Sequence, residues 1–285
     1  MKIGIYNGAF SYFSTPDEQY ARIKALGYDT VDHDLSDTTQ SCYTNDQTMA
    51  AYCSAIHSIA QKHQLDIYQV HGPWPTDDTT SENRAQTLVH MRRSIYGCHL
   101  LGSRYLIIHP QMPYGWDREE DPEYARSLTV NLIRQLLPDC ERFGVTLCLE
   151  NMPMKAHRIS TMERIVETVA KINSPYLGIC FDTGHSNVFG HDLGEMVRLC
   201  APYLKTLHIH DNDGSRDQHL LPFLGTASFD SLCRALGENN FEGPLSLETC
   251  GAVSGNMPPD IRKKAEEITL LTARYLADEV EKYRC

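Results

Sequence analysis

The chain has 285 residues, of which 22% are charged and 41% hydrophobic, and its formal net charge at pH 7 is -11. This composition is that of an ordinary globular protein and disfavours the disordered and fibrous classes. The acidic balance disfavours a partner held mainly through phosphate contacts, so we expect no nucleic-acid partner. The cysteines form no C-x-x-C pair, and the amino-terminal segment lacks the apolar core of a signal peptide, which favours reduced thiols and a cytoplasmic location. No apolar run approaches membrane-spanning length, so we expect no membrane partner.

Short β-rich segments alternate with longer helical patterns along the whole chain. The first helix candidate has proline in its first turn and Gly27 at its end, and Gly102 and Gly144 end two later ones. The segment Ser160–Glu163 has the spacing of a capping box. The strand candidates are Lys2–Tyr6, Thr30–Asp34, Asp66–His71, Tyr105–His109, Thr146–Glu150, Gly178–Asp182, Thr206–His210 and Leu245–Glu248. The helix candidates are Pro16–Leu26, Asp46–His63, Ser81–Leu101, Asp121–Phe143, Ser160–Ile172, Asp192–Ala201, Ser228–Asn239 and Pro258–Tyr283.

Strand and helix therefore repeat eight times, with no linker, low-complexity stretch or charge block between them. This pattern predicts the α/β class and a single (β/α)₈ TIM barrel that spans residues 1–285 as one domain. The competing α/β architecture is a doubly wound open sheet, which has fewer strands and a glycine-rich phosphate turn after the first one. Gly4 and Gly8 do not make that motif. We therefore favour the closed barrel.

Polar residues stand at the ends of six of the eight predicted strands, in YQVHGPW, LIIHPQ, LCLENM, GICFDTGH, TLHIHDND and LSLETC. A single histidine at a strand end is more often a hydrogen-bonded structural residue than a ligand. Here, however, an ionisable group stands at the same end of six strands, and closure of the barrel brings those ends to one mouth. Buried carboxylates crowded together need a counter-charge, which a bound cation supplies. The pattern therefore predicts a metal site at the carboxyl-terminal mouth.

At these residues the sequence resembles the xylose isomerase-like barrel superfamily, which includes sugar isomerases, sugar 3-epimerases, inosose dehydratases and an apurinic-site endonuclease. The motifs are LCLEN, CFDTGH, LHIHDNDG followed by RDQH, and LSLET, and the resemblance covers essentially the whole chain. The histidine ligand is either His208 or His210, and we prefer His208 because the pattern H-x-x-D-N-D-G then places Asp211 correctly. For the sugar-acting members, the resemblance implies one divalent metal held by Glu150, Asp182, His208 and Glu248.

The endonuclease branch of this superfamily uses more ligands, for three zinc ions. Two features of the sequence oppose that branch. The first strand, GIYNGAF, lacks a histidine-containing motif, and the loops SDTTQSCYTND and PWPTDDTTSEN contain no Lys or Arg, although a DNA-binding face needs cations along the phosphates. The resemblance nevertheless implies that the additional metal ligands are present, as His71, His109, His185, Asp217 and His219.

The leading functional hypothesis is a metal-dependent isomerase or epimerase that acts on a sugar or related polyol through an enediolate. The resemblance implies that Glu150 and Glu248 serve as the catalytic base and acid. We expect substrate contacts from His185, His210, Arg216, Trp74 and Trp116. The alternative is a multi-zinc phosphodiesterase of the apurinic endonuclease type; a non-catalytic barrel with a structural metal fits a carboxylate-rich site poorly.

The predicted ligands constrain the identity of the metal only in part. Two Glu, one Asp and one His favour Mn²⁺, Co²⁺ or Mg²⁺, whereas the additional histidines favour Zn²⁺. The sequence leaves open the substrate, its phosphorylation state, the choice among isomerase, epimerase and dehydratase, and whether the chain forms a homo-oligomer.

Overall fold

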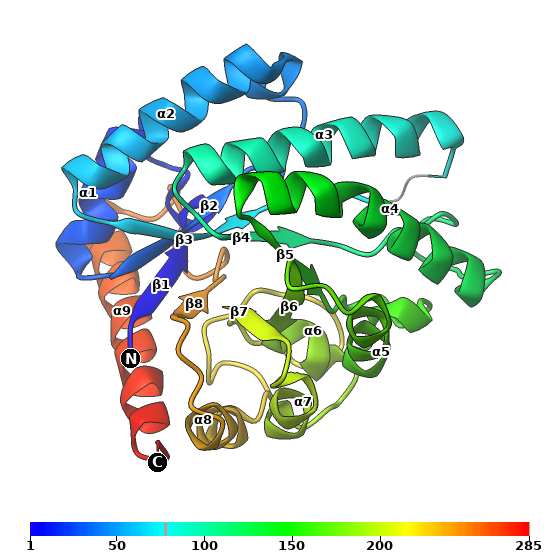
Figure 1. Cartoon of the computed structure of the whole chain (residues 1–285). Coiled ribbons are helices and arrows are strands. Elements are labelled where there is room, and N and C mark those ends of the chain that lie inside the picture. The colour runs from blue at the N-terminus through cyan, green and yellow to red at the C-terminus, as the bar shows by residue number, and fades with distance from the viewer. Residues whose placement is uncertain (77–78, 285) are drawn as a thin grey trace.

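The eight strands of the chain lie parallel in one sheet, in the order β7-β6-β5-β4-β3-β2-β1-β8. The computed structural model describes residues 1–76 and 79–284. Between the two outermost strands a parallel bridge pairs Ile209 with Leu247, so the sheet closes on itself. Figure 1 shows the helices arranged around the outside of this sheet. The predicted (β/α)₈ barrel is thereby confirmed.

Three of the eight predicted strands have the predicted bounds, and the other five differ at their ends. The largest difference is in β7, which begins and ends two residues earlier than predicted. The strands are β1 Ile3–Tyr6, β2 Thr30–Asp34, β3 Asp66–His71, β4 Tyr105–Ile108, β5 Thr146–Glu150, β6 Leu177–Asp182, β7 Leu204–His208 and β8 Leu245–Leu247. The α-helices are α1 Pro16–Leu26, α2 Asp46–Lys62, α3 Ser81–Leu100, α4 Pro122–Phe143, α5 Met162–Ile172, α6 Thr183–Val188, α7 Leu193–Cys200, α8 Phe229–Glu238 and α9 Pro259–Glu281. The 3₁₀ helices are η1 Asn7–Phe10, η2 Ser41–Thr44 and η3 Arg158–Ser160.

Local sequence signals explain where several helices begin and end. The Thr15 hydroxyl accepts a hydrogen bond from the backbone N–H of Glu18, whose carboxylate accepts one in return from the Thr15 N–H, so α1 begins with a capping box. Gly27 and Gly144 adopt φ of +107° and +68°, the left-handed conformation that ends α1 and α4 as predicted. The predicted capping box at Ser160 is wrong, because Ser160 lies in η3 and α5 has no side-chain cap.

Two layers of side chains fill the molecule. Most large apolar residues pack between the outside of the barrel and the helices. A separate small cluster of Ile107, Cys148 and Cys180 lies inside the barrel. Alternation along a strand places Cys148 on the same face as Glu150, two residues later, so this inner cluster forms the floor beneath the mouth.

The described cysteines form no disulfide, and eight of these nine are buried, as expected for thiols that act as core residues. In the described part of the chain, no helix is long and apolar enough to cross a membrane.

Candidate metal centre

Three carboxylates converge on one nitrogen of His208 at the floor of the barrel mouth. The Nδ1 atom of His208 lies 2.6 Å from Glu150 Oε1, 3.2 Å from Glu248 Oε2 and 4.0 Å from Asp182 Oδ2. All four side chains are less than a tenth exposed. They come from the ends of β5, β6, β7 and β8, so strand closure brings together the four residues that the resemblance implied as ligands.

The other nitrogen of His208 is fixed by a residue that the sequence interpretation did not include. His208 Nε2 lies 2.8 Å from Oδ2 of Asp32 on β2, and the Gln69 side chain donates to the same oxygen at 3.0 Å. Both nitrogens of His208 face carboxylates, so the ring either carries two protons or keeps the Nε2 proton, which Asp32 accepts, and offers Nδ1 to a cation. This arrangement supports His208, rather than His210, as the metal ligand.

Two predicted substrate contacts lie away from the open part of the mouth. His210 is fully buried, its Nε2 lies 3.0 Å from Asp182 Oδ2, and its ring stacks on that of His219 with centroids 4.1 Å apart. His210 is therefore placed to orient Asp182 and support His219. Arg216 lies exposed in the loop after β7 and is not among the residues that line the cavity described below.

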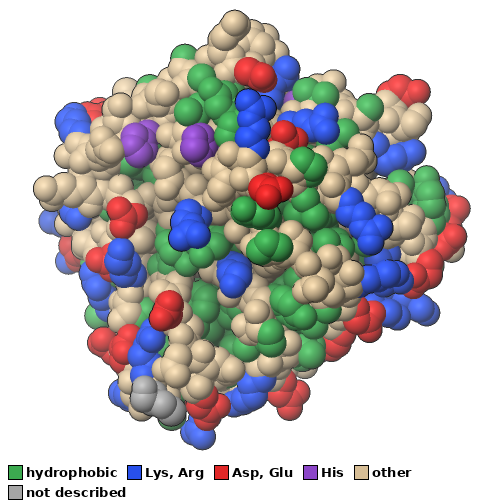
Figure 2. Space-filling model, in the orientation of Figure 1, with side chains coloured by type: hydrophobic (Ala, Val, Ile, Leu, Met, Phe, Trp, Pro, Cys, Tyr) green, Lys and Arg blue, Asp and Glu red, His purple; other side chains and the backbone are tan. Residues whose placement is uncertain are grey.

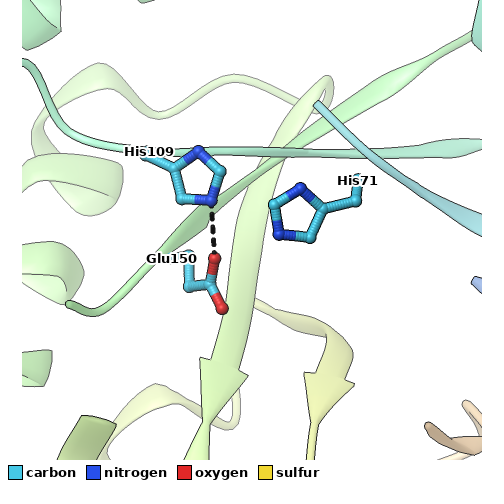
Figure 3. Close-up of side chains that lie close together, drawn as sticks. All are labelled: His71, His109 and Glu150. Atoms are coloured by element: carbon cyan, nitrogen blue, oxygen red, sulfur yellow. Dashed lines mark ion pairs between the residues drawn. The ribbon is translucent and has the colours of Figure 1, made fainter. Parts of the chain in front are cut away.

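The four remaining mouth histidines share one geometry, in which Nδ1 faces a backbone carbonyl and Nε2 faces a carboxylate. The carbonyl contacts join His71 to Gly72, His109 to Pro73, His185 to Asn151 and His219 to Glu248, at 3.1, 3.3, 2.8 and 2.8 Å. The carboxylate contacts join His71 to Glu248, His109 to Glu150, and both His185 and His219 to Asp217, at 3.8, 3.0, 3.4 and 3.0 Å. Figure 3 shows His71 and His109 beside Glu150, with the ion pair drawn from His109.

This shared geometry fits metal ligation. A neutral imidazole has one N–H, so a ring with acceptors within hydrogen-bond distance of both nitrogens, as in His109, His185 and His219, needs either a second proton or a cation. A carbonyl at Nδ1 fixes the tautomer and turns Nε2 toward a metal, as is usual for histidine ligands. The donor atoms also lie close enough together, because those of His71, His109 and Glu150 are all within 4.8 Å of one another.

Protons balance the charges of these ligands in the absence of metal. Burial alone would raise the pKa of Glu150, but the charge of His208 and hydrogen bonds from His109 and His208 hold that pKa well below 4.5. Burial alone would lower the pKa of His208, but its acidic neighbours Cys180, Glu248 and Glu150 raise it well above 6.5. In the same way, burial opposes protonation of His185, while Asp182 and then Asp217 raise its pKa to about 10. A divalent cation would replace these protons at the same atoms, so the donor set fits such an ion.

A cavity of about 370 Å³ opens above this centre. Glu150, Glu248 and the four histidines just described form its polar side, while Asp182 and His208 lie beneath. Trp74 and Trp116 meet edge to face with ring centroids 4.8 Å apart, and Trp74 packs equally close to His109. Both predicted tryptophans therefore line the mouth, and Met152 and Met154 extend their apolar wall.

The structure adds residues to the site that sequence reasoning missed. Asp32 and Gln69 support His208 from inside the barrel, and Tyr6 and Cys250 line the cavity. Strand alternation carried a usable signal for Asp32, because TVDHD places it on the same face as Asp34. Cys250 lies in the loop after β8, where strand periodicity does not indicate the direction of a side chain.

Comparison with known proteins gives matches of two functional kinds. A D-psicose 3-epimerase of Enterocloster bolteae is 21% identical over 273 residues, which cover 92% of this chain and 86% of the relative. A probable endonuclease 4 of Mesomycoplasma hyopneumoniae is 26% identical over 207 residues, which cover 68% of this chain and 72% of the relative.

Solved structures with the same fold include an epimerase and a protein with a bound zinc atom. The 3-keto-D-glucoside 4-epimerase of E. coli superposes with a TM-score of 0.77 at 18% identity, covering 96% of this chain and 99% of that one. The IOLI protein, solved with a bound zinc atom, superposes with a TM-score of 0.76 at 18% identity, covering 99% of each chain. The family model described as a xylose isomerase-like TIM barrel matches residues 20–274, which include nearly the whole barrel and every predicted ligand position at its mouth. The chain therefore belongs to the xylose isomerase-like TIM-barrel family.

Proposed function

We propose that this protein is a divalent-metal-dependent isomerase or epimerase that acts on a sugar or related polyol at the barrel mouth. One observation carries the proposal. Three carboxylates surround Nδ1 of His208 at 2.6 to 4.0 Å, directly beneath a cavity with an apolar wall and a polar wall. The epimerase relatives support this reaction class, because they share the barrel and its full length.

The chain's own residues account for the proton transfers that such a reaction requires. When bound, the cation would polarise the substrate carbonyl and stabilise the negative charge that develops as the enediolate forms. Glu150 and Glu248 reach the cavity from β5 and β8, so either one removes a proton from the carbon beside the carbonyl and the other returns a proton. His109 holds one oxygen of Glu150 at 3.0 Å, which fixes the carboxylate while it exchanges the proton.

The cavity walls favour a small uncharged polyol. Lys and Arg are missing from the described residues that line the cavity, so neither an ammonium nor a guanidinium group is offered to a phosphate. The two tryptophans present ring faces and edges suited to the C–H surface of a sugar, while the opposite wall supplies imidazoles and carboxylates for hydroxyl groups. A neutral substrate also agrees with the net charge of -11.

A multi-zinc phosphodiesterase is the second candidate, and a specific observation favours it. All nine potential ligands converge at the mouth, and four histidines present Nε2 toward carboxylates. The endonuclease 4 relative supports this alternative. Against it, the loops 36–46 and 73–83 contain no Lys or Arg, and Figure 2 shows basic and acidic side chains interspersed over one face of the molecule. Tight binding of a phosphate backbone needs a row of cations.

The deciding experiment combines metal analysis with a substrate panel. Protein reconstituted with Mn²⁺, Co²⁺, Mg²⁺ or Zn²⁺ is assayed on ketoses, aldoses and cyclitols, and on a DNA duplex with an abasic site. We expect turnover of at least one polyol and only slow incision of DNA. Efficient incision by a three-zinc protein that converts no polyol would overturn the proposal and establish the second candidate.

Two variants test the catalytic carboxylates. Glu150→Gln and Glu248→Gln should each lower kcat on the identified substrate by about 10²–10⁴-fold, because each removes a proton-transfer group. Circular dichroism and thermal melting check that the barrel stays folded. Glu195→Gln, at an exposed position on α7, serves as the matched control and should retain wild-type kcat. Near-normal turnover by either mouth variant would exclude that residue from catalysis.

A further inference from the structure

The last helix of the chain, α9, has two apolar faces and only one of them is covered. Its inner face buries Ala273, Leu276 and Val280 against the barrel. The helix packs on β1 and β8 and between α1 and α8, and Figure 1 shows it at the periphery of the molecule. An ordinary surface helix is polar on the side that faces water.

The outer face of α9 instead carries an apolar stripe. Ile261, Ile268, Leu271 and Tyr275 are 58%, 55%, 66% and 48% exposed. Together with the exposed Lys264 and Asp278, they occupy six positions that follow one another at spacings of 3, 4, 3, 4 and 3 residues. That spacing is the seam of a coiled coil, in which residues a and d of each heptad face a partner helix.

The loop between β7 and α8 extends this stripe. Phe223 and Leu224 are 50% and 68% exposed, and the ring of Phe223 contacts that of Tyr275 with centroids 5.6 Å apart. Six of the ten exposed large hydrophobic side chains in the described chain therefore belong to this one surface, which we call the α9 surface. At these exposed fractions each of the six side chains contributes roughly 100 Å² of solvent-accessible surface. The total of roughly 600 Å² approaches the ~800 Å² that each partner contributes to a standard interface.

We propose that the α9 surface binds the same surface of a second copy of this chain, with the two α9 helices antiparallel across a two-fold axis between Ile268 and Leu271. The distribution of charge on the stripe selects this partner and this orientation. Lys264 lies toward one end of the stripe and Asp278 at the other, so antiparallel pairing brings Lys264 near the partner's Asp278. Parallel pairing would instead place like charges together.

The stripe is self-complementary at its centre as well. About the same axis, Ile268 faces the partner's Leu271, and the aliphatic stem and ammonium group of Lys264 face the ring of the partner's Tyr275. Lys264 already pairs with Glu267 within its own helix at 2.7 Å. That pair is solvent-exposed and contributes little, so it does not hold Lys264 away from the interface.

Sedimentation or light scattering on the full chain tests the proposal. We expect wild-type protein at micromolar concentration to have twice the mass of the chain, and Leu271→Asp to weaken association by roughly tenfold or more, as removal of a central anchor does. Val89→Asp and Leu199→Asp are matched controls, because those residues are 39% and 38% exposed elsewhere on the molecule. Wild-type protein that stays monomeric, or equal weakening by the controls, would overturn the proposal.

A charge swap tests the antiparallel orientation. Both positions are exposed, so the substitutions should leave the fold intact. Lys264→Asp and Asp278→Lys should each weaken dimerisation, and the double variant should restore it toward wild type. Equimolar mixing of the two single variants provides a second arm. In antiparallel pairing, the heterodimer of the two single variants has opposite charges at both ends, so mixing should restore association toward wild type. Single variants that dimerise as well as wild type, as parallel pairing predicts, would overturn the antiparallel arrangement.

Discussion

Asp32 lies in an environment that is unfavourable for a carboxylate. The side chain is fully buried, and Oδ2 takes contacts from both His208 and Gln69, while Oδ1 has no protein partner among the described residues. A buried carboxylate oxygen without a partner costs free energy. The compensating gain is the orientation of His208, whose other nitrogen faces the three carboxylates. We interpret Asp32 as the residue that presents His208 to the cation.

Substitution of Asp32 tests this interpretation through metal affinity. Asp32→Asn keeps a side chain of the same size but removes the charge that holds the Nε2 proton, so the metal dissociation constant should rise by about 10–100-fold. Competition with a chromophoric chelator measures it. His33→Gln is the matched control, since His33 is buried on the same strand but bonds to Tyr20 and Tyr52. The control should lower stability and leave metal affinity within about twofold; unchanged affinity in Asp32→Asn would contradict the role.

Prediction from sequence succeeded for residues that end a strand and failed for residues inside the barrel. Glu150 and Asp182 stand directly before turns, so their type and position both indicated the mouth. Asp32 lies in the middle of a strand, where a charged residue is not expected, and its partner His208 is 176 residues away. Only the closed barrel brings these two residues together.

The loop after β7 is the element that completes the site. The carboxylate of Asp211 accepts hydrogen bonds from the backbone N–H groups of Gly225 and Ala227 at 2.8 and 3.1 Å, which fastens the end of the loop to its start. A side chain at position 225 would meet the backbone oxygen of Asn212 at 2.1 Å, so this close approach requires glycine. The loop thereby returns His219 over Glu248, and the carboxylate of Asp211 fastens this loop.

The same loop should make the metal-free protein sensitive to alkaline pH. Burial opposes protonation of His219, while Glu248 and then Asp217 raise its pKa to about 9, and that of His185 is raised to about 10. Unfolded histidine titrates near 6.5, so this stabilisation is complete below pH 6.5 and is lost as the pH rises through 9 and 10. In EDTA, urea denaturation should show that the free energy of unfolding falls by several kcal/mol between pH 6.5 and 10, since each pKa unit corresponds to about 1.4 kcal/mol.

The variant His219→Gln isolates the contribution of the loop. It should have a shallower decline of unfolding free energy between pH 6.5 and 10 than the wild type in EDTA. Saturating metal should remove the decline from the wild type, because the cation replaces the protons and binds more tightly as they leave. Parallel curves for wild type and His219→Gln would show that the pH dependence arises elsewhere.

At the level of helices and strands, hydrophobic periodicity and capping residues predicted several strand bounds and helix ends correctly. Three strands matched at both ends, and Gly27 and Gly144 ended their helices as expected. The short helix α6 was missed, because six residues of GICFDTGHSNV give too little periodicity. Ser160 failed as a cap because it lies within η3, where its backbone oxygen accepts a hydrogen bond from the Met152 N–H at 2.9 Å, and α5 begins only at Met162.

For the whole molecule, the centre should act as a stabilising cross-link among distant segments of the chain. The proposed ligands Glu150, Asp182, His208 and Glu248 come from the ends of four strands. An ion that binds them only in the folded barrel therefore raises the stability of the barrel. At a hundred times the dissociation constant the gain is about 2.7 kcal/mol. Thermal melting should therefore shift upward by several degrees with the bound cation relative to EDTA. An identical melting temperature with and without each of the four cations would argue against an occupied site.

The proposed metal cross-link would lie at the junction of β7 with β8, where the barrel closes. Backbone pairing there is short, with hydrogen bonds at 2.9 Å from Ile209 to Ser246 and at 3.0 Å from Glu248 to Ile209. His208 and Glu248 stand on either side of that junction, and the ion would join them. The bound metal would then hold the barrel wall closed between β7 and β8, so release of the metal and local opening of the wall would be one coupled event. Amide hydrogens at this junction would exchange with solvent on the timescale of metal dissociation, while those of β3, β4 and β5 stay protected.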